Sequence, residues 1–363
     1  MSTLEGPNIG GLEGFVSPGA KDAAERGATV SKRAGVAVIV NPRSRANRRN
    51  PRIAADFHAL VGDAGRVLAP KSLDELEETA RALYRSAPAV VAVHGGDGTL
   101  HLTLSALGRA YGTDPMPPIA ILCGGTMNVV AASLAIREHP TVFLSQLVNA
   151  VRGGETFTTV RRRCLRIGDR LGFLFGNGLM ANFLTEYYGT GTYGPARAAW
   201  LLTRTVLSAM VGGPFVRRLF RRFEGTVRVD GQDLGEATFV GLVAGTVREV
   251  GLGFKLVHRA DEDTERFAML AIHAPPLSLL SDLWSVHAGR GISTKHAFNA
   301  VASTMEVVPR DGAMAYTIDG DLYRHDGEKD GALTIAIGPR IEFVRPSGAL
   351  IARERSDTMR SPS

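Results

Sequence analysis

Two observations predict a fold of two parts, a Rossmann-like parallel α/β domain followed by an antiparallel β-sandwich domain with a helical insert. Up to about residue 155, apolar β-branched runs alternate with amphipathic segments, which is the pattern of βαβ units and a parallel sheet. From residue 156 onward, short runs of period-two alternation follow one another, and several are joined by Gly-Asp or Asp-Gly turns, which predicts antiparallel strands. The helical insert is expected from Pro195 to about Arg222.

The individual elements follow from these patterns. Ser72 and Glu75 form a capping box that should open a helix running to about Arg85. Other helices of the first part are expected over residues 53–60 and after residues 100 and 129, and its buried strands over residues 35–40, 65–68, 90–93 and 117–122. The expected strands of the second part cover residues 158–167, 171–176, 225–229, 237–244, 267–272, 303–308, 314–318, 332–337 and 340–344.

Composition and charge limit the classes of protein to which the chain can belong. The chain has 363 residues, of which 44% are hydrophobic and 21% charged, so it is long enough for two cores. Its net charge of +6, carried by arginine more than lysine, favours anionic partners such as nucleotide phosphates or lipid headgroups. Two cysteines exclude a disulfide framework, and neither a signal peptide nor a transmembrane helix is evident, so a cytoplasmic protein that meets a membrane from the side is expected.

A glycine turn after a buried strand is the strongest sign of a binding site. The strand expected to begin at Val90 ends in a turn that leads into an amphipathic helix. Backbone N–H groups and the helix dipole at such a turn favour a phosphate, and the carboxylate within it suggests a bridging Mg²⁺. An ordinary strand-to-helix turn with an aspartate cap is the alternative. The residues of this turn are Gly95, Gly96, Asp97, Gly98 and Thr99.

Two more strand ends should lie at the same edge of the sheet. One expected strand ends in a second glycine turn and another ends in a polar segment followed by arginines. Because parallel strands present their carboxyl ends together, these turns could hold one polyphosphate between them. The second turn contains Gly125, Thr126 and Asn128, and the polar segment contains Asn41, Pro42, Arg43 and Ser44.

Taken together, these motifs resemble the diacylglycerol kinase catalytic-domain family, which includes bacterial diacylglycerol kinase-like enzymes and sphingosine kinases. The polar segment resembles the family's Asn-Pro-x-Ser nucleotide segment, the first glycine turn matches its signature turn, and the second resembles its Gly-Thr-x-Asn turn. Late in the chain, Ile318-Asp319-Gly320-Asp321 resembles its Asp-Gly-Glu catalytic segment. The resemblance covers about residues 35–350.

The resemblance implies a fold and a site. It divides the chain from residue 35 into an α/β ATP-binding domain (35–155), to which residues 346–356 return, and an antiparallel β lipid-substrate domain (156–345). Residues 1–34 are rich in Gly, Ala and Ser without periodicity and are expected to form a disordered leader. The resemblance implies that ATP and Mg²⁺ are held by the first domain, with Asp97 as a metal ligand, and that the γ-phosphate passes to the hydroxyl of a diacylglycerol or sphingoid-type lipid alcohol. Asp321 takes the place of the family's general base, with Asp319 as its partner. A second metal site corresponds only loosely to Asp263.

Departures from the family pattern leave other functions open. Leu102, Val129 and Asp321 stand where the family has Glu, Asp and Glu, so a catalytically weak member that binds nucleotide or lipid for regulation is one alternative. An NAD kinase-like enzyme with a soluble substrate is a second. Nucleic acid is not expected as a partner, because the arginines are scattered without an aromatic stacking platform. A homodimer is left open.

The helical insert also has two interpretations. It combines apolar residues such as Trp200, Leu207 and Met210 with arginines at 217, 218, 221 and 222. These helices could pack on the core and expose a solvated basic rim, or they could form a basic amphipathic surface that lies against anionic lipid. His94 and His101 are expected to be structural, because no metal-ligand spacing surrounds them.

Overall fold

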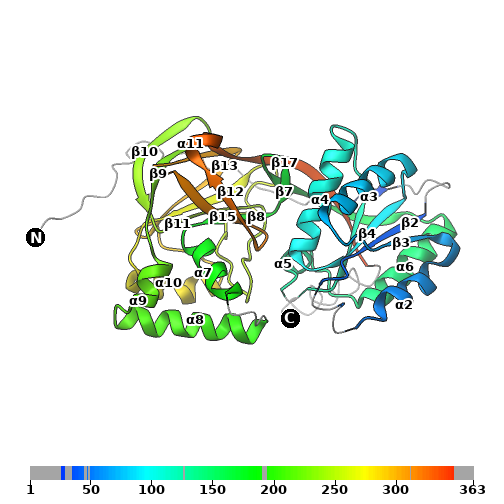
Figure 1. The fold of residues 1–363 in the computed structure, drawn as a ribbon, viewed down its shortest axis with the longest axis horizontal. Helices are drawn as coiled ribbons and strands as arrows, with labels where there is room; N and C mark the ends of the chain where they lie inside the picture. Colours follow the sequence, from blue (N-terminus) through cyan, green and yellow to red (C-terminus); the bar gives the residue numbers. More distant parts are fainter. Residues whose placement is uncertain are drawn as a thin grey trace, which may run out of the picture.

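The computed structural model describes residues 26–28, 35–44, 47, 50–125, 127–189, 194–310 and 312–346, and it contains the two parts that the sequence predicts. Figure 1 shows a layered α/β part and, beside it, a part built mainly of β-strands. The expected leader falls almost wholly outside the described residues. From it, only the strand β1 (Arg26–Ala28) is described, and it pairs with β6 (Phe157–Ile167).

The α/β part is a parallel sheet covered by helices on both faces. Its strands lie in the order β3-β2-β4-β5. Strands β2 and β4 are buried along their whole length because their residues are apolar on both faces, except for the buried His94 of β4. Helix α3 packs against α4 on one face, and α2 packs against α6 on the other (Figure 1). The elements are β2 (Val36–Val40), α2 (Ile53–Val61), β3 (Gly65–Leu68), α3 (Leu73–Ser86), β4 (Val90–Gly95), α4 (Asp97–Tyr111), β5 (Ile119–Cys123), α5 (Val129–Ser133) and α6 (Pro140–Gly153).

The helix ends of this part follow local chemistry. The Oγ of Ser72 accepts a hydrogen bond from the Glu75 N–H at 3.1 Å, and Glu75 accepts one from the Lys71 N–H at 2.7 Å, so the expected cap of α3 is confirmed. A short 3₁₀ turn (Gly62–Ala64) joins α2 to β3.

The second part is a β-sandwich. Its six-stranded antiparallel sheet has the order β13-β12-β11-β8-β15-β16, and it packs against the outer strands of the large sheet around a shared core that includes Phe175, Met269 and Met305. The outer strands of the large sheet are β6, β7 (Arg170–Gly172), β9 (Phe223–Val229), β10 (Gln232–Phe239), β14 (Thr304–Pro309) and β17 (Leu333–Val344). The six-stranded sheet contains β8 (Leu174–Asn177), β11 (Gly241–Gly245), β12 (Phe267–Ile272), β13 (Ala297–Ala302), β15 (Ala313–Ile318) and β16 (Asp321–Asp326).

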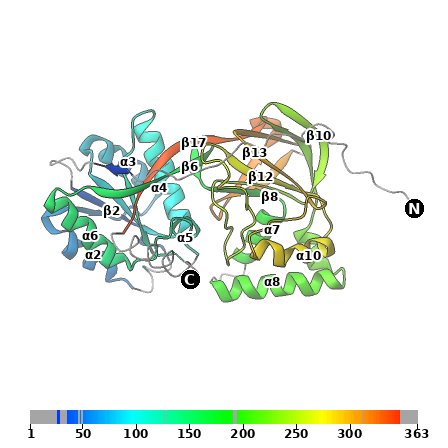
Figure 2. The same cartoon turned by 180° about the vertical axis from the view of Figure 1, so that it is seen from behind.

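Helices cover one end of the sandwich. They are α7 (Leu179–Tyr188), α8 (Pro195–Met210), α9 (Pro214–Leu219) and α10 (Pro276–His287), with a short α11 (Gly327–Asp330) after β16. Figure 2 shows α10 lying beside α8. The sequence pattern predicts neither α7 nor α10 as separate helices. Among the described residues, no helix is long and apolar enough to cross a bilayer.

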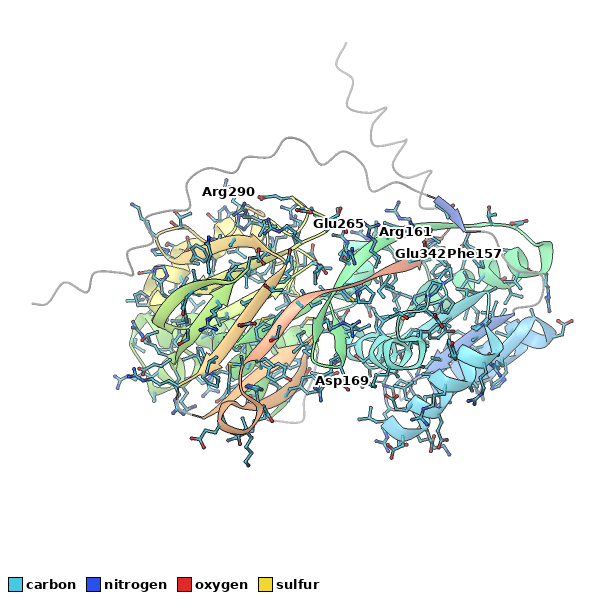
Figure 3. All side chains as sticks on the ribbon, turned by 90° about the horizontal axis from the view of Figure 1, so that it is seen from above. Phe157, Arg161, Asp169, Glu265, Arg290 and Glu342 are labelled. Carbon is cyan, nitrogen blue, oxygen red and sulfur yellow. The ribbon has the colours of Figure 1, made fainter. Side chains whose placement is uncertain are left out.

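The strand β17 joins the two parts. It pairs antiparallel with β14 and β6 in the second part, and at its end Phe343 pairs parallel with Ile119 of β5 in the first. Figure 3 shows β6 and β17 running together from one part to the other, where Arg161 and Glu342 form an ion pair. The last strand therefore returns the chain to the α/β part by residue 344. Of the segment expected to make this return, 346–356, the structure describes only residue 346.

We expect Phe343→Ala to weaken this junction. Phe343 is fully buried, and its ring centroid lies 5.8 Å from that of Phe173. Removing a buried phenylalanine leaves a cavity and typically costs about 3–5 kcal/mol. Denaturant unfolding should show this loss, whereas the control Val308→Ala, at an exposed strand position, should cost less than about 1 kcal/mol. Equal effects in the two variants would contradict the role given to β17.

Candidate active site

Three of the predicted motifs meet at one edge of the parallel sheet. The Asn41 N–H donates to the His94 carbonyl at 3.2 Å, and the Gly124 N–H donates to the Gly95 carbonyl at 2.9 Å, so the ends of β2, β4 and β5 lie side by side. The Asn41 side chain then donates to Thr99 Oγ1 at 2.9 Å. The polar segment is therefore tied directly to the first glycine turn.

The rest of the polar segment forms its own turn. The Arg43 N–H donates to Asn41 Oδ1 at 2.9 Å, and the Ser44 hydroxyl accepts from the Asn47 N–H at 3.3 Å. Pro42 and Arg43 are exposed. Of the arginines that follow, Arg45, Arg48 and Arg49 lie outside the described residues.

The two glycine turns touch each other through bare backbone. A Cβ built on Gly96 would lie 3.1 Å from the Cα of Gly125, so side chains at this point would push the turns apart. Asn128 adopts a left-handed conformation with φ 48°, and its side chain accepts from the Gly125 N–H at 3.0 Å, which fixes the second turn. The predicted binding residue Thr126 lies outside the described residues.

Asp97 links the starts of two helices. Its Oδ2 accepts from the Val129 N–H at 3.0 Å and its Oδ1 accepts from the Val130 N–H at 3.2 Å, so the first residue of α4 caps α5. Burial raises the pKa of this carboxyl, and the hydrogen bonds from the backbone oppose the rise. Gly96, at the N-cap of α4, offers no side chain to the first N–H groups of that helix.

Asp321 comes from the other part of the molecule and lies against the first glycine turn. A Cβ built on Gly98 would lie 2.9 Å from Oδ2 and 3.1 Å from Oδ1 of Asp321. Its Oδ2 is buried, without a hydrogen-bond partner among the described residues. Burial raises the pKa of Asp321 to about 6. The late Asp-Gly-Asp segment and the glycine turn therefore share one site.

Asp319 holds the turn that carries Asp321. Both of its oxygens accept from the Phe173 N–H at 3.0 Å, and Oδ1 also accepts from the Leu174 N–H at 2.8 Å. Burial raises the pKa of Asp319 well above its ordinary value, and the neighbouring charges of Asp97 and Asp321 add to the rise. This geometry indicates that Asp319 positions the turn that carries Asp321. The role of Asp319 as a partner in catalysis stays a prediction.

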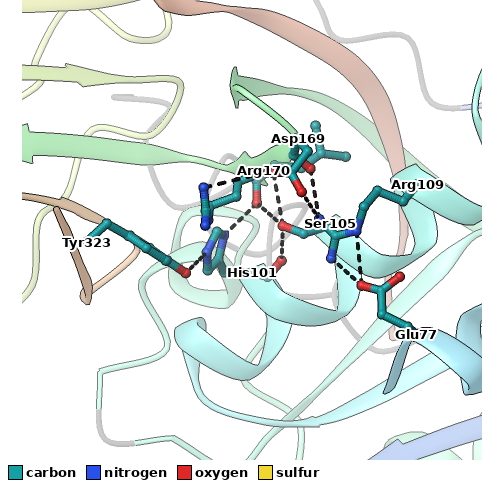
Figure 4. Close-up of polar contacts among 8 residues, drawn as sticks. Glu77, His101, Ser105, Arg109, Asp169, Arg170 and Tyr323 are labelled. Atoms are coloured by element: carbon teal, nitrogen blue, oxygen red, sulfur yellow. Dashed lines mark hydrogen bonds and ion pairs between the residues drawn. The ribbon is translucent and has the colours of Figure 1, made fainter. Parts of the chain in front are cut away.

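A polar network around His101 connects the two parts behind this site (Figure 4). His101 Nδ1 lies 2.7 Å from the Leu171 carbonyl, which can only accept, so Nδ1 carries the proton and donates. Nε2 then accepts from the Tyr323 hydroxyl at 2.7 Å. Burial lowers the pKa of His101 to about 4, so the ring stays neutral in this network above that pH.

No motif or spacing in the sequence marks His101 or Tyr323 as neighbours of the site. Tyr323 follows Asp321 by two residues on β16 and therefore lies on the same face of that strand. The Arg170 guanidinium lies 4.5 Å from the centre of its ring. The one signal that could have identified His101 is its position in the helix directly after the glycine turn, where the diacylglycerol kinase family has an asparagine.

The predicted metal residues lie in different settings. Asp97 faces the site, whereas Asp263 caps its own turn, with Oδ1 accepting from the Glu265 N–H at 2.8 Å. Among the described residues, no group of three or more His, Cys, Asp or Glu side chains is arranged to hold a metal. The role of Asp263 as a ligand stays a prediction.

These residues fit a nucleotide better than a metal cage. The uncapped first turn of α4 and the bare glycine backbone beside it suit a phosphate group. The unpartnered Oδ2 of Asp321 faces that turn and suits a donor or a cation brought by a substrate. Since Mg²⁺ in kinase sites is bound by one or two carboxylates together with substrate phosphates, Asp97 is the side chain of this turn that could contribute to holding it.

Comparisons with known proteins agree with this arrangement. Residues 35–156 match the family model of the diacylglycerol kinase catalytic domain, so the resemblance seen in the motifs is confirmed for this part of the chain. The match supports a function of the kinase type. No curated protein matches the sequence.

Solved structures show the same fold over most of the chain. A crystal structure of a diacylglycerol kinase from Bacillus anthracis str. Sterne has a TM-score of 0.57 and 13% identity, covering 87% of this chain and 98% of that one. A second chain described as a diacylglycerol kinase of the same organism has a TM-score of 0.61 and 13% identity, covering 86% and 98%. At this identity the likeness concerns the fold, and it extends beyond the residues that the family model matches.

We expect Asp321→Asn to stabilise the protein at neutral pH. The raised pKa means that the folded state prefers the neutral carboxyl, so the stability of the wild type falls as the pH rises from about 4 through about 6. Asparagine removes that cost, which is of order 1–3 kcal/mol. Thermal unfolding should show a gain of a few degrees at pH 8 and little gain at pH 4. The same difference at both pH values would contradict the burial of an unpaired carboxylate.

Proposed function

We propose that the protein is an ATP-dependent lipid kinase that transfers the γ-phosphate of ATP to the hydroxyl of a lipid alcohol of the diacylglycerol or sphingoid type. The observation that carries the proposal is the contact of the Asp321 carboxylate with Gly98 of the glycine turn. This contact brings a candidate general base to the place where the turn would hold phosphate. The family match and the fold of the neighbours support a kinase, and the choice of ATP and of a lipid acceptor is the proposal.

In this mechanism the first glycine turn binds the phosphates. The N–H groups of Asp97, Gly98 and Thr99, at the start of α4, would donate to phosphate oxygens, and Asn41 would hold Thr99 in place through its hydrogen bond. Mg²⁺, when bound with the nucleotide, would neutralise charge on the phosphates beside Asp97. Positioning and charge neutralisation are the main demands of phosphoryl transfer.

Asp321 would accept the proton of the lipid hydroxyl. As the hydroxyl oxygen bonds to the γ-phosphorus, the bond from that phosphorus to the bridging oxygen of ADP breaks, and the proton passes to the carboxylate. A pKa of about 6 keeps Asp321 ionised at neutral pH, yet makes it a stronger base than an exposed aspartate. The shorter side chain, compared with the family's glutamate, is matched by the close approach that Gly98 allows.

The departure at Val129 does not remove the contact made at that position. The Asp97 carboxylate accepts a hydrogen bond from the backbone N–H of Val129, which any residue at this position except proline would donate. This backbone hydrogen bond is therefore retained, and a lipid phosphorylation assay decides between an active kinase and the alternative of a catalytically weak member that only binds nucleotide or lipid. Because the proposed acceptor is a lipid, we also propose that the protein works at a membrane surface without spanning it.

The experiment that tests the proposal is phosphorylation of lipid alcohols in detergent micelles with labelled ATP. We expect Asp321→Asn to lower the rate at least ~10²-fold, because the proton acceptor is lost. The wild-type rate should rise with pH through about 6, where the carboxyl ionises, and then level off. A folded Asp321→Asn variant with the wild-type rate would remove this residue from the mechanism, and a wild type that binds nucleotide without transfer would favour the regulatory alternative.

We expect Gly98→Ala to lower the rate at least ~10-fold, since the new methyl would lie about 3 Å from the Asp321 carboxylate and displace it. Gly153→Ala, at the end of α6, is the matched control. It also adds a methyl to a helical glycine, but the nearest atom, at 3.3 Å, is the end of the exposed Glu155 side chain. Lipid phosphorylation and thermal unfolding should be measured for both variants. Equal rates in the two would show that the closeness of Gly98 and Asp321 has no role in transfer.

A further inference from the structure

One face of the β-sandwich part exposes large apolar side chains in an unusual concentration. On the outer side of α8 and the turn after it, Leu207 is 60% exposed and Val211 81% exposed, and on α10 Trp284 is 77% exposed. Helices α8 and α10 are in contact, and Figures 1 and 2 show them next to each other along the lower side of the β-sandwich part. We call this surface the α8/α10 face, and its apolar members are Trp200, Leu207, Met210, Val211, Leu277 and Trp284.

Helix α8 is apolar on two sides. Its inner side, with Ala198, Leu201 and Ala209, is buried, and Ala198 and Leu201 pack in a small core with Phe215 and Leu219 of α9. The outer side repeats apolar residues at helical spacing, yet no described element covers it. Core packing therefore explains the inner side and leaves the outer side without a structural role.

The charged side chains of the α8–α9 segment are of one sign. The segment from Pro195 to Arg222 contains no Asp or Glu, and its arginines are Arg197, Arg204, Arg217, Arg218, Arg221 and Arg222. Two of them flank the exposed Trp200 ring, with the Arg197 guanidinium 4.7 Å and that of Arg204 5.5 Å from its centre. Arg218 lies 3.6 Å from Glu186 of α7. A half-exposed tryptophan between guanidinium groups is typical of a membrane–water interface.

We propose that the α8/α10 face docks on a bilayer that contains anionic lipid. Aliphatic and indole side chains would enter the headgroup layer while the arginines contact lipid phosphates. A second copy of the chain is a poorer occupant, because two such faces would bring arginines against arginines. Nucleic acid is a poorer one as well, since it would leave Leu207, Met210 and Val211 in water.

The face is connected to the candidate active site. Helix α7 precedes α8, and the hydroxyl of Tyr188 at its end donates to the Gly320 carbonyl at 2.9 Å. Gly320 lies between Asp319 and Asp321, so the helix that precedes α8 in the chain holds the turn that carries the proposed base. Docking here would place the bilayer near α7, the helix that contacts the turn before Asp321. This inference deepens the proposed function by naming the surface, but the binding itself can be tested without catalysis.

The test is sedimentation of the full chain with vesicles of phosphatidylcholine alone and of phosphatidylcholine with about one third phosphatidylglycerol. We expect binding to the anionic vesicles and at least ~10-fold weaker binding to the neutral ones, with a steep loss as salt increases. Leu207→Glu should weaken binding to the anionic vesicles at least ~10-fold, because it replaces an inserted apolar group with a like charge to the lipid. Trp284→Ala, on α10, should weaken it as well.

Leu73→Glu is the matched control. Leu73 is 61% exposed, like Leu207, but it lies on α3 of the other part, and a glutamate there suits the start of a helix. If Leu73→Glu weakens binding as much as Leu207→Glu, or if neither Leu207→Glu nor Trp284→Ala weakens it, the proposal is wrong. A wild type that forms dimers which Leu207→Glu dissociates, in light scattering, would assign the face to a second copy and also overturn it.

Failure of this inference can be told apart from failure of the proposed function. Short-chain diacylglycerol in detergent micelles presents no bilayer, so Leu207→Glu should phosphorylate it at the wild-type rate. A protein that binds anionic vesicles but phosphorylates no lipid would keep the docking surface and reject the kinase. A protein that phosphorylates micellar lipid but does not bind the vesicles would support the kinase and reject the docking surface.

Discussion

The placement of the site depends on the Asp319 carboxylate. Its oxygens accept the N–H groups of Phe173 and Leu174, where β7 gives way to β8, and this fixes the turn between β15 and β16. The turn needs such a hold, because Asp319 itself has a φ of 48°, which is costly for a residue with a side chain. With Asp319 anchored, Asp321 has little freedom to move away from Gly98. One buried carboxylate therefore positions another.

The two parts of the molecule meet through backbone pairing as well as side chains. The strand β17 belongs to the sandwich for most of its length and to the parallel sheet at its end, so the parts are joined by a continuous sheet. The neutral His101 adds a second junction, between α4 and Tyr323 of β16. Since Gly98 is on α4 and Asp321 is on β16, this junction ties together the same two elements that form the site. The network behind the site therefore helps to fix the distance across it.

The sequence carried enough information to predict the fold class and the meeting of the motifs, because both follow from local patterns. Strand ends and glycine turns are written in short segments, and parallel topology then places the motifs at one edge. The function of Asp97 as a cap for α5 could not be read in this way, since its partners are backbone N–H groups 32 and 33 residues away. The same holds for His101, whose partner Tyr323 is 222 residues away.

An unpartnered buried carboxylate requires a compensating benefit, because it lowers the stability of the folded state. Nearby residues could have satisfied Asp321, as backbone amides satisfy Asp319, yet its Oδ2 remains open toward the glycine turn. The neighbouring charge of Asp97 adds to that of Asp321, and together they help to raise the pKa of Asp319. Such a site would disfavour bare phosphate but favour phosphate that arrives with a cation. The combination of a glycine turn suited to phosphate with buried carboxylates therefore supports the proposed metal–nucleotide complex as the ligand of this site. The cost of leaving the Oδ2 of Asp321 without a partner likewise supports its proposed role in catalysis rather than in the fold.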